Sequence, residues 1–441
     1  MSADDANLRT RIIEKLRAGD FEGARGSAQS AVDSTPDNAP LWHLLGIAHV
    51  QCQELELAIP CLEKAVELKP SKANYHFNLG YTLQKLSRIQ DAKQVYRKAI
   101  QLQANFVEAQ TNLANLLVNE AAFSEAILIF RDVIHSNPEN ADACFNLANA
   151  LLANSEFEES TQWYRAAIDL DCGHSAAREN LARAYTERSM TQDAVGVLQS
   201  WLEFDPDNEF AKYMQAAITG EDLPDRASDE CVKNTFDRFF ATSFEEQLAK
   251  LHYRMPALIQ EYIDSIDKSD HSIVLDAGCG TGLIGPILKP ISSRLVGVDL
   301  SEDMLAEAKS KRVYDELVEA ELSAFFKQRM AEFDLIVCSD TLCYFGELSE
   351  VVAASAGSLT DQGRFLFTVE AFSDPEPPES ESSNGKFQLQ ANGRYRHWPE
   401  YVKSVVSKSG LKLLDCRLVV IRKELGVDVS GLLVVCMKID D

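Results

Sequence analysis

The feature that most constrains the fold of this chain is a repeat of 34 residues that runs from about residue 5 to residue 208. One column of the repeat carries small residues: Ala24, Ala58, Ala92, Ala126, Ser160 and Ala194. A second column carries Leu45, Leu79, Leu113, Leu147 and Leu181, each followed by Gly or Ala. Such a period predicts stacked helix pairs, because one pair cannot bury its apolar face alone.

The ends of the repeat support this interpretation. Proline falls at the same column in Pro36, Pro70, Pro138 and Pro206, where it stops the second helix of a pair. The pattern resembles a tetratricopeptide array of about six units, of which residues 5–38 match least well. We expect Glu209–Ile218 to form a helix that covers the last apolar face. The predicted repeat domain is 1–220, followed by a polar linker at 221–230.

Within the repeats, asparagine recurs at one position of four successive first helices: Asn78, Asn112, Asn146 and Asn180. Each amide offers two donors and an acceptor, so a row of them can hydrogen-bond an extended peptide backbone. The row resembles the asparagine ladder in the repeats of O-linked N-acetylglucosamine transferase. The alternative is that asparagine is simply tolerated on an exposed helix face. We take the ladder as a hypothetical peptide-binding groove.

Composition excludes several kinds of partner and location. The net charge of −25 argues against nucleic acid as a partner, since such binding depends on Lys and Arg neutralising phosphates. The ten cysteines form no disulfide framework and no metal-ligand pattern, as expected for free thiols in a reducing compartment. The polar N-terminus is unlike a signal peptide, and no apolar run approaches the roughly 20 residues of a membrane span. We therefore expect a cytoplasmic protein with no membrane contact and no metal site.

From about residue 231 the pattern changes to strands that alternate with helices, which predicts a parallel α/β sheet over 231–441. The expected strands are 272–276, 294–299, 316–320, 333–338, 363–369, 411–422 and 430–438, the last two forming a hairpin. The segment 372–392 is rich in Ser, Glu and Pro and poor in apolar residues, which predicts a mobile loop. The predicted fold class is a multidomain α plus α/β chain, with an all-α solenoid before a Rossmann-like domain.

A glycine-rich turn follows the first of these strands and allows two interpretations. Gly280–Gly285 satisfies the G-x-G-x-x-G fingerprint of NAD-binding proteins, with Asp299 placed for a ribose. The pattern Asp276-x-Gly278-x-Gly280-x-Gly282 begins earlier and includes an acid. That acid would repel a pyrophosphate, which prefers a helix N-terminus without negative charge nearby. It would attract the cationic ammonium and sulfonium of S-adenosylmethionine, so we favour the second interpretation.

The second pattern resembles motif I of the class I S-adenosylmethionine-dependent methyltransferases, and the resemblance covers about residues 270–440. It implies a seven-stranded domain that uses S-adenosylmethionine as cofactor. By this resemblance Asp276 faces the methionine amino group and Asp299 binds the ribose hydroxyls. The implied cofactor-binding residues are Asp276, Gly278, Gly280, Gly282, Asp299, Leu300, Met304, Glu321 and Ser339. Glu321 stands where the family more often has Asp.

Four further stretches look like a subgroup of predicted methyltransferases with tetratricopeptide repeats: 236–241, 251–256, 344–346 and 393–397. The resemblance implies an N-terminal lid in which Phe236, Phe239 and Tyr253 close the site. These residues would equally suit an ordinary helix packed on the sheet.

Candidates for a general base are His397, Asp340, Tyr344 and Tyr253, and the sequence does not decide whether a base is needed. His397 stands among Arg394, Arg396 and Trp398, a cationic neighbourhood that could bind an acidic acceptor. A surface histidine beside a mobile loop would show the same pattern.

The sequence thus predicts a methyltransferase whose repeats recruit a peptide or protein partner or substrate. One alternative is an adaptor whose methyltransferase-like domain binds the cofactor without catalysis, and a second is an NAD-dependent oxidoreductase. The acceptor could be a protein or a small molecule, and N-, O- and C-methylation remain open.

Overall fold

The computed structural model describes the chain except residues 1–2, 238–240, 267–271, 375–384, 425 and 440–441. The chain divides into two compact units, Met1–Ala184 and Tyr185–Asp441. No helix in the described part of the chain combines the length and apolar character that a membrane span requires.

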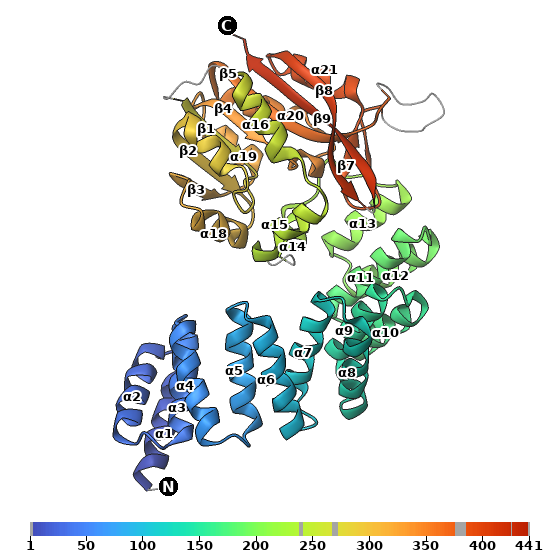
Figure 1. The fold of residues 1–441 in the computed structure, drawn as a ribbon. Helices are drawn as coiled ribbons and strands as arrows, with labels where there is room; N and C mark the ends of the chain where they lie inside the picture. Colours follow the sequence, from blue (N-terminus) through green and yellow to red (C-terminus); the bar gives the residue numbers. More distant parts are fainter. Residues whose placement is uncertain (1–2, 238–240, 267–271, 375–384, 425, 440–441) are drawn as a thin grey trace. The chain divides into compact units, whose positions relative to one another are not determined.

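The first unit is a row of helix pairs of nearly constant length (Figure 1). Its helices are α1 (Ala3–Arg17), α2 (Phe21–Ser34), α3 (Ala39–Gln51), α4 (Leu55–Leu68), α5 (Ala73–Lys85), α6 (Ile89–Leu102), α7 (Val107–Asn119), α8 (Phe123–Ser136), α9 (Ala141–Ala153), α10 (Phe157–Leu170) and most of α11 (Ser175–Glu187). The small-residue column is buried, as at Ala58, Ala92 and Ala126. The predicted tetratricopeptide-type array is therefore confirmed.

The turn inside each helix pair contains a residue in the left-handed region. These residues recur with the period of the repeat, at Gly19, Gln53, Ser87, Ala121, Ser155 and Ser189, with φ between 57° and 76°. Glycine adopts this conformation without strain, whereas a side chain costs about 1–2 kcal/mol there. Five of the six turns therefore carry backbone strain.

Replacing Ala121 with glycine is expected to raise the free energy of unfolding of the array by about 0.5–1 kcal/mol, because Ala121 has φ of 59°. Urea denaturation monitored by circular dichroism measures the change. Ala166→Gly, inside α10, is the control and is expected to lower stability by a similar amount. A lower stability for Ala121→Gly would contradict the strain argument.

The second unit begins with two more helices of the repeat series, α12 (Thr191–Phe204) and α13 (Glu209–Thr219). Asn208 caps α13 by accepting a hydrogen bond from the Ala211 N–H at 2.9 Å, and Gly220 ends it with φ of 74°. The predicted capping helix is thus confirmed. Its Tyr213 and Ala217 are buried in the same apolar core as the sheet that follows.

A nine-stranded sheet lies at the centre of the second unit (Figure 1). Its strands are β1 (Ser272–Ala277), β2 (Ser292–Asp299), β3 (Glu316–Glu319), β4 (Phe333–Cys338), β5 (Leu359–Ala371), β6 (Phe387–Leu389), β7 (Tyr395–His397), β8 (Leu411–Glu424) and β9 (Val427–Lys438). Strands β3, β2, β1, β4 and β5 pair in that order and are parallel. Antiparallel β9 then pairs with β5 and with β8. This confirms the predicted seven-stranded arrangement with its terminal hairpin.

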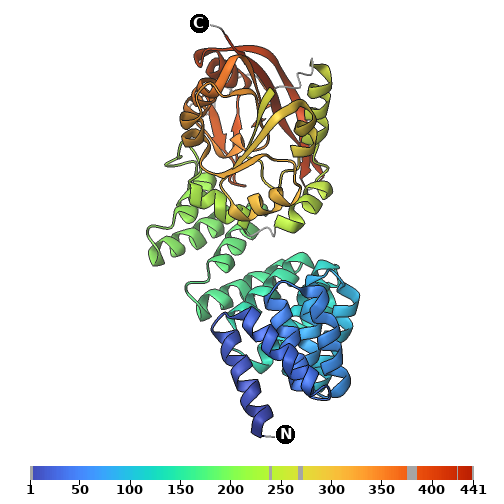
Figure 2. The same cartoon turned by 90° about the vertical axis from the view of Figure 1, so that its left-hand side faces the viewer.

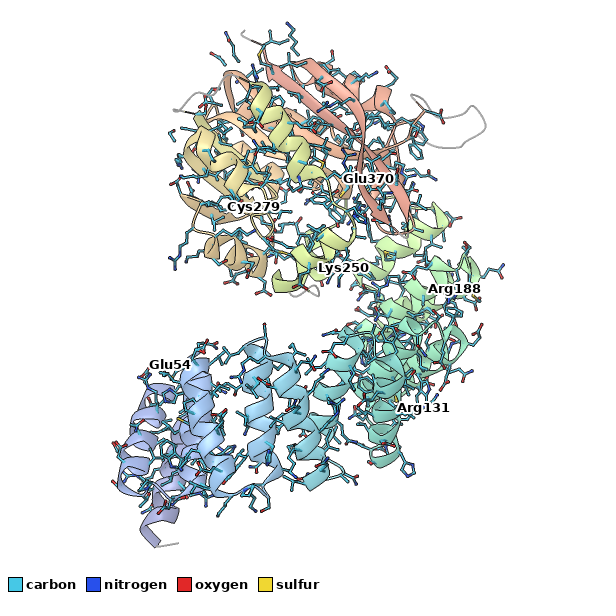
Figure 3. All side chains as sticks on the ribbon, viewed as in Figure 1. Glu54, Arg131, Arg188, Lys250, Cys279 and Glu370 are labelled. Carbon is cyan, nitrogen blue, oxygen red and sulfur yellow. The ribbon has the colours of Figure 1, made fainter. Side chains whose placement is uncertain are left out.

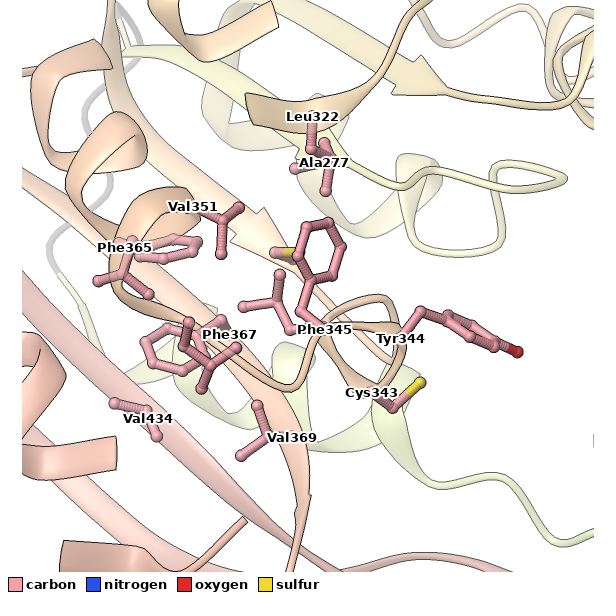
Figure 4. Packing of buried hydrophobic residues seen from close by; sticks show 14 of the residues in the cluster. Ala277, Leu322, Cys343, Tyr344, Phe345, Val351, Phe365, Phe367, Val369 and Val434 are labelled. Atoms are coloured by element: carbon pink, nitrogen blue, oxygen red, sulfur yellow. The ribbon is translucent and has the colours of Figure 1, made fainter. Parts of the chain in front are cut away.

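Helices cover both faces of the sheet, which explains the apolar strands (Figure 2). They are α16 (Met255–Ser265), α17 (Gly285–Leu288), α18 (Glu302–Ser310), α19 (Leu322–Gln328), α20 (Ser349–Ser358) and α21 (Pro399–Lys408). Two further helices, α14 (Asp229–Asp237) and α15 (Ala241–Lys250), contact α18. Alternate residues of β5 point into different apolar cores. Phe365, Phe367 and Val369 lie in one core together with Val351 and Val434 (Figure 4). Leu366 of β5 enters the opposite core, with Met255 of α16.

Two short strands depart from the prediction. β6 lies in the segment predicted as a loop, whose residues 375–384 are outside the described part of the chain. β7 pairs in parallel with the end of β5, with Arg396 opposite Glu370 and His397 opposite Ala371. β4 pairs with β5 only as far as Phe367, so the last residues of β5 are free to pair with β7.

Candidate cofactor and acceptor site

A cavity opens at the carboxyl ends of β1, β2 and β4, where ligands bind in parallel α/β sheets. Eight of the nine predicted cofactor residues line it: Asp276, Gly278, Gly280, Asp299, Leu300, Met304, Glu321 and Ser339. The ninth, Gly282, is not among the described lining residues. The predicted site residues therefore come together from separate loops.

The glycines of the loop after β1 have different roles. A Cβ at Gly278 would lie 2.1 Å from the Thr341 hydroxyl, and one at Gly282 would lie 2.8 Å from the Tyr314 ring. A Cβ at Gly280 would meet no atom within 4 Å, although Gly280 lines the cavity. Gly280 is therefore the glycine that leaves space for a ligand, whereas Gly278 and Gly282 permit packing.

Asp299, at the end of β2, fixes this loop. Its carboxylate accepts hydrogen bonds from the Gly280 N–H at 2.8 Å and the Ser301 N–H at 3.0 Å. Ser301 in turn caps α18 by accepting from the Met304 N–H. The carboxylate thus joins the glycine loop to the α18 N-terminus at the edge of the cavity.

Asp276 is almost completely buried, with 1% of its surface exposed. Burial raises the pKa of its carboxyl to about 7, a hydrogen bond from the Tyr314 hydroxyl opposes the shift, and the nearby Asp299 adds to it. That hydrogen bond is 2.6 Å long. A positive charge placed in the cavity would stabilise the ionised carboxylate.

Glu321 caps the N-terminus of α19 by accepting from the Ala324 N–H at 2.8 Å. Its other carboxylate oxygen accepts from Arg226 at 3.2 Å. Glu321 therefore has a structural role as well as a place in the cavity wall. Apolar surface beside it comes from Leu300 and Met304.

Two of the three residues predicted to close the site are in the cavity wall. Phe236 of α14 and Tyr253 line the cavity, and so does Phe244 of α15, which the sequence analysis did not select. Phe236 packs edge-on against Phe244, with ring centroids 6.0 Å apart. Glu245 of α15 accepts a hydrogen bond from the Thr281 hydroxyl at 2.8 Å, which attaches this helix to the glycine loop. Phe239 lies outside the described residues.

Three of the four predicted base candidates line the cavity: Asp340, Tyr344 and Tyr253. Burial raises the pKa of both tyrosine hydroxyls, so at neutral pH they are hydrogen-bond donors and not bases. Asp340 follows β4 with φ of 54°, a strained conformation for a residue other than glycine.

His397, a predicted base candidate, is not among the described residues that line the cavity, so it is not placed to act on a ligand there. Its ring is fully buried and bonds through Nε2 to the Gly346 carbonyl at 3.1 Å. Burial lowers the pKa of His397 to about 4. The residue of that segment that does line the cavity is Arg394.

A buried ionic network, which the sequence analysis missed, lies at this end of the cavity. Arg422 of β8 bonds through Nε to Glu424 at 2.7 Å, through one terminal nitrogen to Asp340 at 3.3 Å, and through the other to Glu370. Arg394 bonds the same Glu370 oxygen at 3.2 Å. Figure 3 labels Glu370, at the end of β5, and Cys279 of the glycine loop, which also lines the cavity. In the described residues, no group of three or more His, Cys, Asp or Glu could hold a metal ion.

Comparison with known families agrees with this geometry. Residues 275–367 match a family model described as a methyltransferase domain. Residues 48–87, 73–106 and 111–173 match models of tetratricopeptide repeats. The chain therefore carries a methyltransferase domain after tetratricopeptide repeats, and domains of this family use S-adenosylmethionine.

Individual relatives match over limited lengths. The ubiquinone biosynthesis O-methyltransferase of Hydrogenovibrio crunogenus is 26% identical over 149 residues, which are 32% of this chain and 61% of that protein. The malonyl-[acyl-carrier protein] O-methyltransferase of Enterobacter lignolyticus is 33% identical over 95 residues, 22% of this chain and 38% of that protein. The chain thus spans less than two thirds of these relatives.

Among solved structures, the repeats are similar to YrrB, described as a TPR protein with an unusual peptide-binding site. The identity is 20%, over 42% of this chain and 96% of that chain, with a TM-score of 0.37.

Proposed function

We propose that this protein is an S-adenosylmethionine-dependent methyltransferase whose repeats recruit a peptide or protein partner or substrate. The observation that carries the first part is that eight of the nine predicted cofactor residues line one cavity. When bound, the cofactor supplies a methyl group that its sulfonium activates. The chain would contribute binding, alignment and exclusion of water.

The side chains of the predicted cofactor residues suit such a cofactor. Asp276 would pair with the methionine ammonium, and Asp299 would accept hydrogen bonds from the ribose hydroxyls. Leu300 and Met304 offer apolar surface to the adenine. The open space beside Gly280 would let the ligand approach the backbone closely. Phe236 and Phe244 would exclude water from the methyl group.

The structure gives less support to an NAD-dependent oxidoreductase. A pyrophosphate is stabilised by the N-terminus of a helix, but the helix after the glycine loop, α17, has four residues. Tyr314 packs over Gly282 and Gly285, and buried Asp276 would repel phosphate. These features favour a cationic ligand.

Asp299→Ala is expected to weaken S-adenosylhomocysteine binding at least about tenfold, because the lost hydrogen bonds to a charged group are worth about 1.5–3 kcal/mol. Calorimetric titration measures the affinity, and circular dichroism checks that the variant is folded. An unchanged affinity in a folded variant would contradict the site assignment.

Binding is also expected to depend on pH through Asp276, whose pKa burial raises to about 7. The ammonium of the ligand requires the carboxylate, so affinity for S-adenosylhomocysteine should fall about tenfold between pH 8 and pH 6. Asp276→Asn should remove this dependence. Tyr314→Phe should move the transition to higher pH, since the Tyr314 hydroxyl lowers the pKa. Titrations at several pH values test both expectations, and a flat profile in the wild type would contradict them.

The stability of the unliganded protein should increase as pH falls, whereas the ligand affinity should decrease. The pKa of Asp276 is above its usual value of 3.8 in the folded state, so the folded state binds more protons between these values. The contribution of Asp276 to stability therefore grows as pH falls from about 7 toward 3.8. Opposite trends in affinity and stability distinguish this effect from general unfolding.

For the array, the asparagine row supports a peptide partner. Asn78, Asn112, Asn146 and Asn180 are all half-buried. Neighbouring side chains orient three of them: His43 contacts the Asn78 amide nitrogen at 2.6 Å, and Tyr96 and Asn149 accept from Asn112 and Asn180. Since an amide has two N–H groups and an oxygen, each of these bonds leaves capacity for a partner.

The array proposal is tested with two variants of the full chain in affinity purification. One changes Asn78, Asn112, Asn146 and Asn180 to Ala, and the control changes exposed Asn105, Asn119 and Asn137. We expect the first variant to lose a partner that the control retains. If both variants keep every partner, the ladder is not a binding site. If the protein binds S-adenosylhomocysteine but the captured partner is not methylated, the non-catalytic adaptor is the better interpretation.

A further inference from the structure

The cavity has a second polar end whose residues are not among the predicted cofactor residues, although Tyr253 hydrogen-bonds Ser339 there. We call it the acceptor end and define it by Tyr253, Asp340, Tyr344, Arg394 and Arg422, all of which line the cavity. These residues come from the segments after β4, before β7 and in β8, and from the segment before α16. Its two guanidinium groups, those of Arg394 and Arg422, differ in how many of their nitrogens bond to carboxylates.

Arg422 is a structural cation. It is 1% exposed, and all three of its nitrogens bond carboxylates, those of Glu424, Asp340 and Glu370. These contacts connect Asp340 to the end of β5 through one shared cation. Arg422 therefore has little hydrogen-bonding capacity left for a ligand.

Arg394 is held more loosely. One of its terminal nitrogens lies 3.2 Å from Glu370 and 3.8 Å from Glu424, and its guanidinium lies over the Tyr344 ring at 5.9 Å. A quarter of its side-chain surface, 25%, is exposed. A guanidinium carries five N–H groups, so these contacts orient Arg394 without using its full capacity.

The charges of the cavity wall differ between its two ends. The cofactor end contains Asp276, Asp299 and Glu321, and Arg226, which also lines the wall, pairs with Glu321. The excess of carboxylates there favours a positively charged ligand. At the acceptor end the two guanidiniums contact three carboxylates, those of Asp340, Glu370 and Glu424, so this end has no net positive charge. An anion would be held there by the N–H groups of Arg394 that these contacts do not use, since a guanidinium binds a carboxylate through two parallel hydrogen bonds.

Much of the remaining wall is apolar. It includes Phe236, Phe244, Leu248, Leu251 and Phe345. Such a wall favours a ligand whose body is aromatic or aliphatic, because burial of apolar surface stabilises the complex.

We propose that the methyl acceptor is a small molecule with an apolar body and a carboxylate, and that Arg394 recognises the carboxylate. This inference rests on the proposed methyltransferase function and names its substrate class. Arg394 belongs to the β6–β7 hairpin, which adds to the seven predicted strands, so specificity for the acceptor lies in an insertion. The hairpin places Arg394 through hydrogen bonds from the Gln390 N–H to its carbonyl, at 2.9 Å, and from its own N–H to Asn392, at 3.1 Å.

The test uses the full chain saturated with S-adenosylhomocysteine and calorimetric titration with matched pairs of acid and amide. The pairs are benzoate and benzamide, cinnamate and cinnamamide, and octanoate and octanamide, with phenethylamine as a cation of similar shape. We expect at least one acid to bind about tenfold more tightly than its amide. Arg394→Gln should abolish this preference, and Arg394→Lys should keep part of it.

Arg396→Gln is the matched control, because Arg396 is two residues away on β7, where its guanidinium lies over Phe372, and does not line the described cavity. It should keep the preference. The inference is overturned if amides or phenethylamine bind as tightly as acids, if the preference survives Arg394→Gln, or if no acid binds at millimolar concentration. A chain that fails to bind S-adenosylhomocysteine contradicts the proposed function instead. The acid–amide comparison in the wild type stands even if Arg394→Gln does not fold.

Discussion

Replacement of Gly280 by leucine is expected to abolish binding of S-adenosylhomocysteine while the protein remains folded. Gly280 lines the cavity, and a Cβ there would meet no protein atom within 4 Å. A leucine side chain would therefore occupy the space that the ligand requires. The backbone has φ of 52° at this position, so a loss of stability of about 1–2 kcal/mol should accompany the change.

The matched control is Gly410→Leu. Gly410 has φ of 74° and open space around its Cβ position, and it follows α21, outside the described cavity wall. It should show a similar loss of stability in urea denaturation with unchanged ligand affinity. An affinity of Gly280→Leu within about threefold of the wild type would contradict the assignment of this glycine.

The second large effect concerns where the methyltransferase unit begins. A fragment of residues 185–441 is expected to fold, whereas a fragment of 221–441 should be strongly destabilised. The reason is that Tyr213 and Ala217 of α13 are buried in the main core of the unit. The Tyr213 hydroxyl also donates to the Gly393 carbonyl at 2.8 Å. The predicted boundary at residue 220 would cut through this core.

In the full chain, Tyr213→Ala should lower the free energy of unfolding of this unit by about 3–5 kcal/mol, as for other buried aromatic residues. Phe204→Ala, at a side chain that is 52% exposed on α12, should change it by less than about 1 kcal/mol. Denaturation of both fragments and both variants measures these differences. Equal stability of the two fragments would support the boundary at residue 220.

Much of the fold could be predicted because its signals are periodic. The 34-residue period determines the helix pairs, and short apolar runs ending in polar residues mark β1, β2 and β4. The core that α13 shares with the sheet could not be predicted, because the sequence marks the apolar face of α13 but not the surface that covers it. β6 and β7 were missed because three-residue strands in a polar segment carry no periodic signal.

In the site, too, residues of a local motif could be predicted, whereas residues that only the fold brings together could not. The cofactor end follows one local motif, Asp276–Gly282, and the carboxylate at the end of the next strand, so its residues could be selected from spacing. Arg422, Glu370 and Arg394 meet only because β8, β5 and β7 converge at one end of the cavity. The sequence indicated a cationic neighbourhood near residues 394–397, but it selected His397, which is buried behind the wall. Whether a side chain of a three-residue strand reaches the cavity depends on which way it points. The sequence pattern of so short a strand does not show that direction.

The measurement that tests the central claim most directly is calorimetric titration of the full chain with S-adenosylhomocysteine and, separately, with NAD. The Asp276→Ala variant is titrated in parallel. We predict micromolar affinity for S-adenosylhomocysteine in the wild type, a loss of that affinity in the variant, and no heat from NAD. Binding of NAD, or of neither compound, would contradict the methyltransferase account and leave the repeat array as the functional part of the chain.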